Sequence, residues 1–265
     1  MPPDSPPKII VHFGVHKTGT TTAEATLEAN RDLLAPVAQI VTRKTWPDVT
    51  KAAKIHSTDP STLTRFGEVF AARLADVVLG ADQALLISNV DLSGQLPGHP
   101  EVTNYDGLPA RLNEIQGQLL SRFGAQAQLR FVMTTRGPAA WLRSLWAQNL
   151  KVHREVRSQE EFAEQFADLA QFSPLIKAIS CAISPGTLTV EPLENTSLLP
   201  MGPATAALRP LGSVLPPLPL VPHRPMKQSL PEEALELLLG MNRSGVSDKA
   251  LKEVKSDAIY LMQNL

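Results

Sequence analysis

The chain has 265 residues, of which 43% are hydrophobic, and this is enough to build an extensive core in one large domain or two small ones. Its 25 Lys and Arg residues balance 26 Asp and Glu residues, so the net charge of −1 excludes a general electrostatic attraction to nucleic acid or acidic membranes. The single cysteine, Cys181, cannot form an internal disulfide.

The expected compartment follows from the same sequence. A protein with one cysteine fits a reducing environment. The first ten residues, MPPDSPPKII, lack a basic start followed by a long apolar core, and no stretch reaches the roughly 20 apolar residues of a membrane-spanning helix. We therefore expect a cytoplasmic, soluble protein without a signal peptide or a transmembrane segment.

Short apolar segments alternate with helix-length patterns along the chain. Runs rich in Val, Ile, Leu and Phe predict strands at 8–14, 36–42, 83–88, 128–135 and 186–193. Helical patterns occupy about 20–34, 61–80, 107–123, 137–151 and 158–182, with a break in the last expected at Pro174. This order predicts an α/β fold with a central parallel sheet flanked by helices, and ligands that bind at the carboxyl ends of the strands.

The last third of the chain has a different character. Residues 195–230 contain eight prolines among Leu, Val and Met residues, which predicts a proline-rich segment that wraps the body and includes one short helix near 203–211. Residues 231–265 are expected to form two C-terminal helices. We predict a single domain over residues 1–265 and find no internal repeat.

A candidate anion site lies where the first predicted strand becomes a helix. Residues 14–21, GVHKTGTT, combine two glycines that let the backbone approach an oxygen, one lysine charge, and several hydroxyl groups. The free N–H groups at a helix start and the helix dipole favour an anion at such a position. The alternative is that Thr20 to Thr22 only cap the helix and that Lys17 is a solvated loop residue.

The loop differs from the motif that binds nucleoside triphosphates. That motif is G-x-x-x-x-G-K-[ST], with the lysine after the second glycine, whereas here Lys17 precedes Gly19. The strand at 83–88 also ends in Ser88-Asn89 rather than in a magnesium-binding aspartate. Both differences weaken an ATPase or GTPase interpretation.

The segment HFGVHKTGTT resembles the 5′-phosphosulfate loop of bacterial sulfotransferases, whose loop helix ends near the Asn-Arg pair found here at Asn30-Arg31. A second segment, FVMTTRGPAAWLRSLWAQ at 131–148, is similar to the 3′-phosphate site of the same family, in which a strand ends in an arginine and a serine follows eight residues later. Arg136 and Ser144 match that spacing. The segment HRPMKQSLPEEALELLLGMNRSG, beginning at His223, also resembles the closing part of such enzymes.

The resemblance implies a P-loop α/β fold that binds 3′-phosphoadenosine 5′-phosphosulfate, with 3′-phosphoadenosine 5′-phosphate as the product. Lys17 is then expected to contact the bridging oxygen and the 5′-phosphate, and Arg136 with Ser144 the 3′-phosphate. The full set of cofactor-binding residues that the resemblance implies is Lys17, Thr18, Gly19, Thr20, Thr21, Arg136, Ser144, Arg224 and Lys227. The plain alternatives are a surface arginine after a strand and a neutral serine in a helix.

In-line sulfuryl transfer depends on positioning and on stabilisation of the leaving phosphate, so Lys17 is also a catalytic candidate. The chemistry requires no metal, and the six histidines and one cysteine are scattered, so we expect no metal site. A base for the acceptor hydroxyl contributes typically ~10²–10⁴ in rate. Relatives often place it just after the strand at 83–88; the candidates here are Asp91, His16, Glu28 and Glu24, each of which has a plain reading as a turn, loop or solvated helix residue.

The sequence does not assign the residues that recognise adenine, nor the acceptor. Thr22 stands where eukaryotic cytosolic members carry an adenine-stacking tryptophan, and the stripe of Trp141, Leu142, Leu145 and Trp146 is more typical of a core than of an adenine platform. The acceptor is expected to be a hydroxylated carbohydrate, lipid or small metabolite, between loops 88–107 and 151–162. The competing functions are a nucleotide kinase or other phosphotransferase, and a non-catalytic module that binds the nucleotide.

Overall fold

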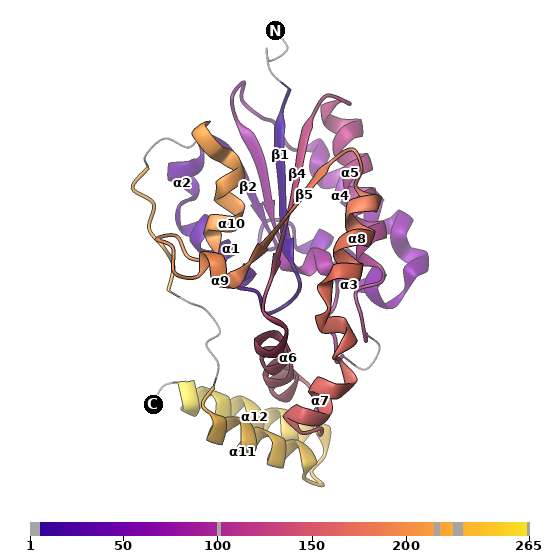
Figure 1. The fold of residues 1–265 in the computed structure, drawn as a ribbon, viewed down its shortest axis with the longest axis vertical. Coiled ribbons are helices and arrows are strands. Elements are labelled where there is room, and N and C mark those ends of the chain that lie inside the picture. Colours follow the sequence, from indigo (N-terminus) through magenta and orange to yellow (C-terminus); the bar gives the residue numbers. More distant parts are fainter. Residues whose placement is uncertain (1–5, 100–101, 215–217, 225–229, 264–265) are drawn as a thin grey trace. The chain divides into compact units, whose positions relative to one another are not determined.

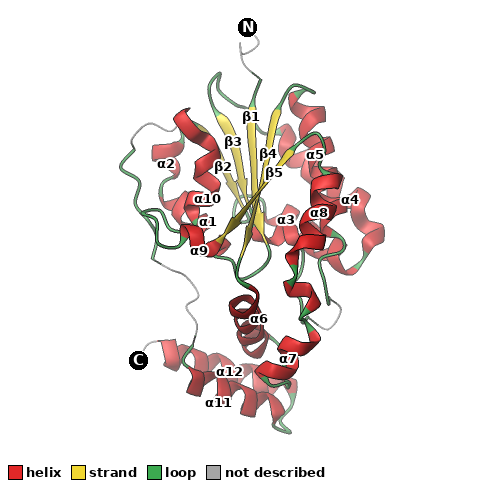
Figure 2. Ribbon diagram, in the orientation of Figure 1, coloured by secondary structure: helices red, strands yellow, loops and turns green. Residues whose placement is uncertain are grey.

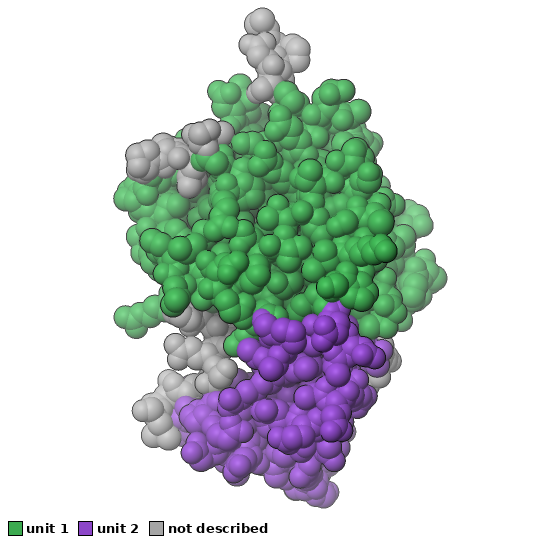
Figure 3. Space-filling view, in the orientation of Figure 1, with its two compact units in different colours: residues 1–96, 104–136, 172–226 green, residues 97–103, 137–171, 227–265 purple. Residues whose placement is uncertain are grey.

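The computed structural model describes residues 6–99, 102–214, 218–224 and 230–263. Within the single domain predicted for the chain, these residues gather into two compact units (Figure 3). We call residues 1–96, 104–136 and 172–226 the sheet unit, and residues 97–103, 137–171 and 227–265 the helical unit.

The sheet unit contains five parallel strands in the order β2-β3-β1-β4-β5, which confirms the predicted α/β fold with a central parallel sheet. All five strands lie within two residues of their predicted limits. They are β1 Lys8–Gly14, β2 Ala38–Thr42, β3 Ala84–Ser88, β4 Gln128–Thr135 and β5 Thr187–Pro192. The inner strands β1 and β3 read as continuous apolar runs because helices cover both faces of the sheet, whereas β5, at one edge, alternates polar and apolar residues and is partly exposed.

Strand order decides which face each helix covers, since right-handed crossovers in opposite directions place their helices on opposite faces. The connection from β1 to β2 carries α1 and α2, and α10 packs against α1 on that side. The other face holds α3, α4, α5 and α8, which pack against one another in sequence (Figures 1 and 2). The bounds are α1 Thr20–Ala29, α2 Arg31–Leu34, α3 Pro47–Thr58, α4 Leu63–Ala75, α5 Leu108–Phe123, α8 Phe172–Ala182, α9 Leu193–Thr196 and α10 Ala204–Leu208.

Two predicted helices have different limits in the structure. The helix expected at 20–34 divides at Asn30, whose side-chain amide donates to the Thr26 and Val221 carbonyl oxygens and whose Oδ1 accepts from the Val221 N–H. Asn30 thereby ends α1 and fixes part of the proline-rich segment against it. The helix expected at 61–80 is the shorter α4, which begins at Leu63 and ends at Ala75.

The break expected at Pro174 was wrong. The chain leaves the helical conformation between α7, Gln159–Gln165, and α8, which begins at Phe172. Pro174 lies in the first turn of α8, where its missing N–H would have had no partner in any case. Helix α3 was not predicted at all, although Pro47 at its start and the buried Val49, Ala53 and His56 form a helical spacing.

The helical unit consists of α6 Pro138–Val152, α7, α11 Glu232–Arg243 and α12 Asp248–Gln263, and the last two confirm the predicted C-terminal helices. Trp141 and Trp146 are buried in this unit, as expected for core residues. Arg154 donates to the Ser244 and Val246 carbonyl oxygens and pairs with Asp248, so it fixes the turn between α11 and α12. Within the described ranges, no helix is both long and apolar enough to cross a membrane.

Candidate functional site

Four strands of the sheet unit change from apolar to polar at their carboxyl ends, on the face that α1 covers. Apolar residues of these strands form one cluster with α1 and α10. Two positions further along each strand, and therefore on the same face, the side chain is polar. The four pairs are Ile40 and Thr42, Leu86 and Ser88, Ile10 and His12, and Val132 and Thr134. This polar layer forms the floor of the candidate site.

The loop after β1 lies at the switch point of the sheet. The chain leaves β1 toward β2 and leaves β4 toward β5, so the connections from these neighbouring strands diverge. Ligands of open α/β sheets bind in the crevice at such a point, outside the carboxyl ends of the strands. Gly14 of β1 lies opposite Thr134 of β4, and the Val15 N–H donates to the Thr134 carbonyl oxygen at 3.3 Å.

The loop backbone is strained at one residue. Lys17 has a φ of 69°, and it is the one non-glycine residue with positive φ in the described part of the chain. The left-handed conformation costs an L-residue about 1–2 kcal/mol, and such residues are concentrated at ligand sites. Gly19 follows at φ 84° and precedes α1 without a side-chain cap on the first turn. The helix start therefore presents its N–H groups beside a lysine.

The threonine hydroxyls of the loop are occupied differently from the sequence-based expectation. The Thr18 hydroxyl donates to the Val15 carbonyl oxygen at 2.7 Å and lies 2.8 Å from the Thr134 hydroxyl oxygen. Thr20 Oγ1 lies 3.4 Å from the same Thr134 oxygen. Thr18 and Thr20 are nearly fully buried, so these hydroxyls hold the loop against β4 rather than project from it. Thr21 is half-buried.

The two loop glycines are required by close packing. A Cβ on Gly14 would lie 2.0 Å from Thr134 Oγ1 and 2.9 Å from the Thr134 carbonyl oxygen. A Cβ on Gly19 would lie 2.8 Å from Leu193 Cδ1 and 2.9 Å from Pro203 Cβ. The glycines thus let β4 and the chain around α9 and α10 close on the loop.

His16 is fixed by Tyr105, a residue that the sequence analysis missed. The Tyr105 hydroxyl oxygen lies 3.0 Å from His16 Nδ1 and accepts from the His16 N–H at 3.1 Å. The two rings stack with centroids 5.9 Å apart. Burial raises the pKa of Tyr105, so it stays a neutral donor to the imidazole. His16, a candidate base, is therefore held as part of the loop wall.

Asp91 lies in a short 3₁₀ helix, Val90–Ser93, that follows β3. The Asn89 side-chain oxygen accepts from the Asp91 N–H, and the Asn89 amide donates to Thr50 Oγ1 of α3. The Asp91 carboxylate pairs with Lys54 Nζ at 3.1 Å. It is thus an anchored, charge-compensated residue at the position where the resemblance implies a base.

Arg111 of α5 binds the backbone of this 3₁₀ helix. Its guanidinium donates to the Leu92 and Ser93 carbonyl oxygens and contacts His56 Nδ1 at 2.7 Å. Burial, followed by the charge of Arg111, lowers the pKa of His56 to about 4, so this imidazole is a neutral acceptor. The Ser93 hydroxyl in turn donates to the Gly14 carbonyl oxygen at 2.7 Å, which joins the ends of β3 and β1.

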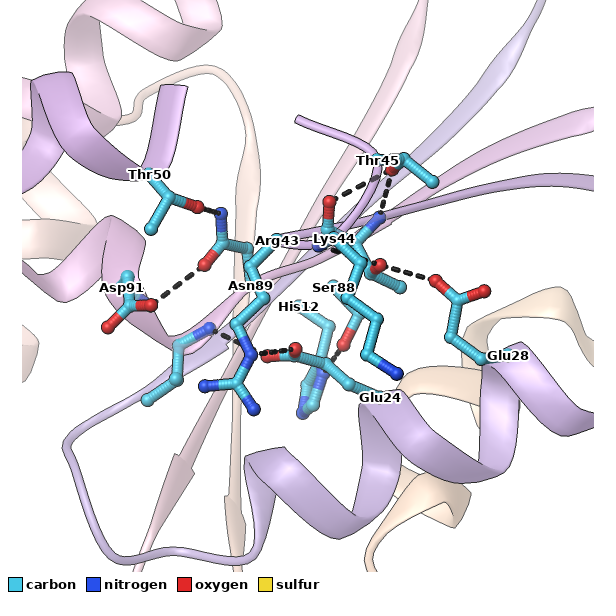
Figure 4. A network of polar contacts seen from close by, with 12 residues as sticks. His12, Glu24, Glu28, Arg43, Lys44, Thr45, Thr50, Ser88, Asn89 and Asp91 are labelled. Atoms are coloured by element: carbon cyan, nitrogen blue, oxygen red, sulfur yellow. Dashed lines mark hydrogen bonds and ion pairs between the residues drawn. The ribbon is translucent and has the colours of Figure 1, made fainter. Parts of the chain in front are cut away.

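Glu24 and Glu28 have different surroundings although both lie on α1 (Figure 4). Glu28 accepts hydrogen bonds from the Arg31 guanidinium and from the Thr42 hydroxyl. Glu24 is only 4% exposed; its Oε1 accepts from the Val90 N–H at 3.2 Å, and its Oε2 lies 2.9 Å from Arg43 Nε. Burial raises the pKa of Glu24 to about 7, although Arg43 and the Val90 N–H oppose the rise.

His12 lies in the polar layer of β1. Its Nδ1 lies 2.8 Å from Ser88 Oγ, whereas its Nε2 is buried without a hydrogen-bond partner. Burial lowers the pKa of His12 to about 4, because a protonated imidazole would be poorly solvated there. The ring is therefore neutral near pH 7.

The residues expected at the 3′-phosphate belong to different parts of the chain. Arg136 follows Thr134 by two residues in the sheet unit, so its Cα lies within about 7 Å of a residue that contacts the loop. Ser144 is a buried residue of α6 in the helical unit. Arg224 is exposed, next to His223, whose N–H donates to Thr26 Oγ1 of α1. Lys227 lies outside the described residues.

The 151–162 segment provides fewer available cations than its sequence indicates. Arg154 is engaged by α11 and α12, as described above, and Arg157 pairs with the buried Glu155. No group of three or more His, Cys, Asp or Glu residues that could hold a metal ion occurs in the part of the chain that the structure describes.

Comparison with known proteins adds no assignment. No protein-family model matches the chain, and a search of curated proteins returns no match. The interpretation of the site therefore depends on its geometry and on the residues themselves.

Proposed function

We propose that the chain is a sulfotransferase that moves a sulfuryl group from 3′-phosphoadenosine 5′-phosphosulfate to a hydroxyl group of a carbohydrate, lipid or small metabolite. The observation that carries the proposal is the left-handed backbone of Lys17 at the switch point of the sheet. A strained non-glycine residue persists only where its surroundings hold it, and here it lies beside an uncapped helix start.

Charge at the site supports an anionic ligand. Lys17 lies in the loop, and Arg136 follows the neighbouring strand β4, at the same edge of the sheet. A guanidinium binds a phosphate with paired hydrogen bonds, whereas an ammonium acts as a compact charge. A ligand with two separated phosphate groups fits two such cations on neighbouring strands.

In the proposed reaction the donor is held through its 5′-phosphate by the loop N–H groups and Lys17. The bridging oxygen between sulfur and phosphorus becomes the leaving group, and Lys17 stabilises the charge that develops there. The backbone N–H groups of the loop contribute donors that need no reorganisation, because Thr18, Thr20 and Thr134 already fix the loop.

A thermal-shift experiment tests the donor class. Adenosine 3′,5′-bisphosphate is compared with ATP, each with and without Mg²⁺. We expect stabilisation by the bisphosphate without Mg²⁺, and none by ATP. If only ATP together with Mg²⁺ stabilised the protein, the result would instead favour a phosphotransferase.

Variants locate the binding site. We expect Lys17→Ala to abolish the shift caused by the bisphosphate, and Arg136→Ala to weaken its binding by about tenfold or more, as a lost charged hydrogen bond implies. Lys177→Ala removes an exposed lysine of α8 and serves as the control, with unchanged binding expected. Unchanged affinity in both site variants would refute the assignment.

A further inference from the structure

We propose that the Glu24 carboxylate accepts the proton of the acceptor hydroxyl during the transfer, and that Arg43 positions it for this role. The inference depends on the proposed sulfotransferase function and assigns its missing base. It differs from the position that the resemblance implies, because the base comes from α1 rather than from the chain after β3.

The position of Glu24 relates it to the anion loop. Glu24 follows Thr20 by four residues and Thr21 by three. Its side chain therefore lies one turn after these two threonines on the same side of α1, with its Cβ about 5–6 Å from theirs. Its carboxylate also accepts from the N–H of Val90, just beyond β3, the strand next to β1. Glu24 thus joins the loop and the end of β3 at the carboxyl edge of the sheet.

The other candidates differ from Glu24 in their partners or their position. Glu28 accepts from both Arg31 and Thr42, and His16 contacts Tyr105 through Nδ1. Asp91, like Glu24, has one cation beside it, but that cation is Lys54 of α3, whereas Glu24 lies on α1, one turn from the helix start that follows Lys17. The Arg43 side chain beside Glu24 is 28% exposed. A small movement of Arg43 toward solvent would leave the carboxylate able to accept a proton.

The groups that face Glu24 explain why its proton affinity suits a base. Burial is the largest cause that raises the pKa of Glu24; Arg43 and the Val90 N–H lower it, Asp91 and Glu28 raise it, and the net pKa is about 7. The imidazole of His12, in strand β1, is neutral at pH values near 7, because its pKa is lowered to about 4. A base with a pKa near the working pH combines a populated unprotonated form with a sufficient proton affinity.

The proposed step is balanced. The acceptor hydroxyl oxygen forms the new bond to sulfur as the bond between sulfur and the bridging oxygen breaks. The electron pair of the broken bond stays on the 5′-phosphate beside Lys17, and the hydroxyl proton passes to Glu24. No oxidant, reductant or metal takes part in this exchange.

The test measures release of ³⁵S-labelled product from labelled donor, with water and 2-naphthol as acceptor probes. We expect Glu24→Gln to lower kcat at pH 8 by about 10²-fold or more, while the Kd for adenosine 3′,5′-bisphosphate stays within about twofold. Glu68→Gln, which removes a carboxylate of an exposed ion pair on α4, should keep the wild-type rate.

The pH profile separates proton transfer from a structural role. Because the unprotonated carboxylate is the reactive form, the wild-type rate should rise with pH through about 7. Arg43→Met removes a charge that lowers the pKa, so the midpoint should move to higher pH. An unmoved midpoint, or a wild-type rate in Glu24→Gln, would overturn the assignment.

Failure of the function and failure of the inference give different results. A wild-type protein that binds the bisphosphate but consumes no donor would overturn the role of Glu24 and leave a nucleotide-binding module. A protein that does not bind the bisphosphate would refute the proposed function itself. Circular dichroism and thermal unfolding establish that each variant is folded.

Discussion

The ends of β1 and β3 lie on neighbouring strands at the same edge of the sheet, and their polar groups are arranged in different ways. After β1, the chain presents a lysine in a left-handed conformation and an uncapped helix start. At the end of β3, two carboxylates each have a cation beside them: Asp91, which follows β3, pairs with Lys54, and Glu24 of α1, which accepts from the Val90 N–H, pairs with Arg43. The first region presents positive charge, which is the basis of the proposed anion site, whereas the second contains paired carboxylates, which are the basis of the proposed proton transfer.

The largest expected effect comes from a mutation that disrupts the loop after β1 and leaves the chain after β3 unchanged. Gly14→Ala places a Cβ 2.0 Å from Thr134 Oγ1 and 2.9 Å from a backbone oxygen, so the loop must move away from β4. We expect a loss of about 3 kcal/mol in the free energy of unfolding, together with loss of bisphosphate binding. Urea denaturation and thermal shift measure both.

Gly117→Ala is the matched control for this change. A Cβ on Gly117, an exposed position of α5, would meet no atom within 4 Å. We expect it to stabilise the protein by about 0.5–1 kcal/mol, because alanine favours helix. If Gly14→Ala were equally benign, the close approach of Thr134 to the loop would not exist in solution.

The second-largest effect is the pH dependence that Glu24 gives to the free energy of unfolding. The pKa of Glu24 is raised from 4.5 to about 7 by folding, so its contribution to stability is fully present below pH 4.5 and is lost as the pH rises to about 7. At about 1.4 kcal/mol per pH unit, this loss is at most about 3 kcal/mol. Glu24→Gln should therefore gain stability relative to the wild type between pH 5 and pH 8.

Measuring this difference requires the wild type and the variant at each pH, since His12 acts in the opposite direction. The lowered pKa of His12, from 6.5 to about 4, makes stability fall as the pH drops through that window. Because both proteins contain His12, its contribution cancels in the difference. A difference in unfolding free energy that stays constant with pH would show that Glu24 titrates normally.

The smallest effect concerns the strain at Lys17. Lys17→Gly and Lys17→Ala both remove the ammonium, but only glycine adopts a φ of 69° without steric cost. We expect the glycine variant to be more stable than the alanine variant by about 1 kcal/mol, with bisphosphate binding lost in both. Equal stabilities from denaturant titrations would exclude a strained backbone at this residue.

The sequence predicted the fold well because local patterns and topology agree. All five strands follow from short apolar runs, and their alternation with helices requires a parallel sheet. The same sequence did not predict α3, whose few apolar residues give a weak helical pattern, or the break at Asn30, which depends on Val221 nearly 200 residues away.

For the site, the sequence alone predicted an anion loop with Lys17 at a strand-to-helix junction, and the structure shows that these residues do lie between the end of β1 and the start of α1. The tertiary structure decided which hydroxyls face β4, that Tyr105 fixes His16, and that Glu24 differs from Glu28 one turn away. The physical reason is that burial and charge pairing arise from contacts between distant segments. Neighbouring carboxylates on one helix therefore acquire different partners and different burial only when the chain has folded around them.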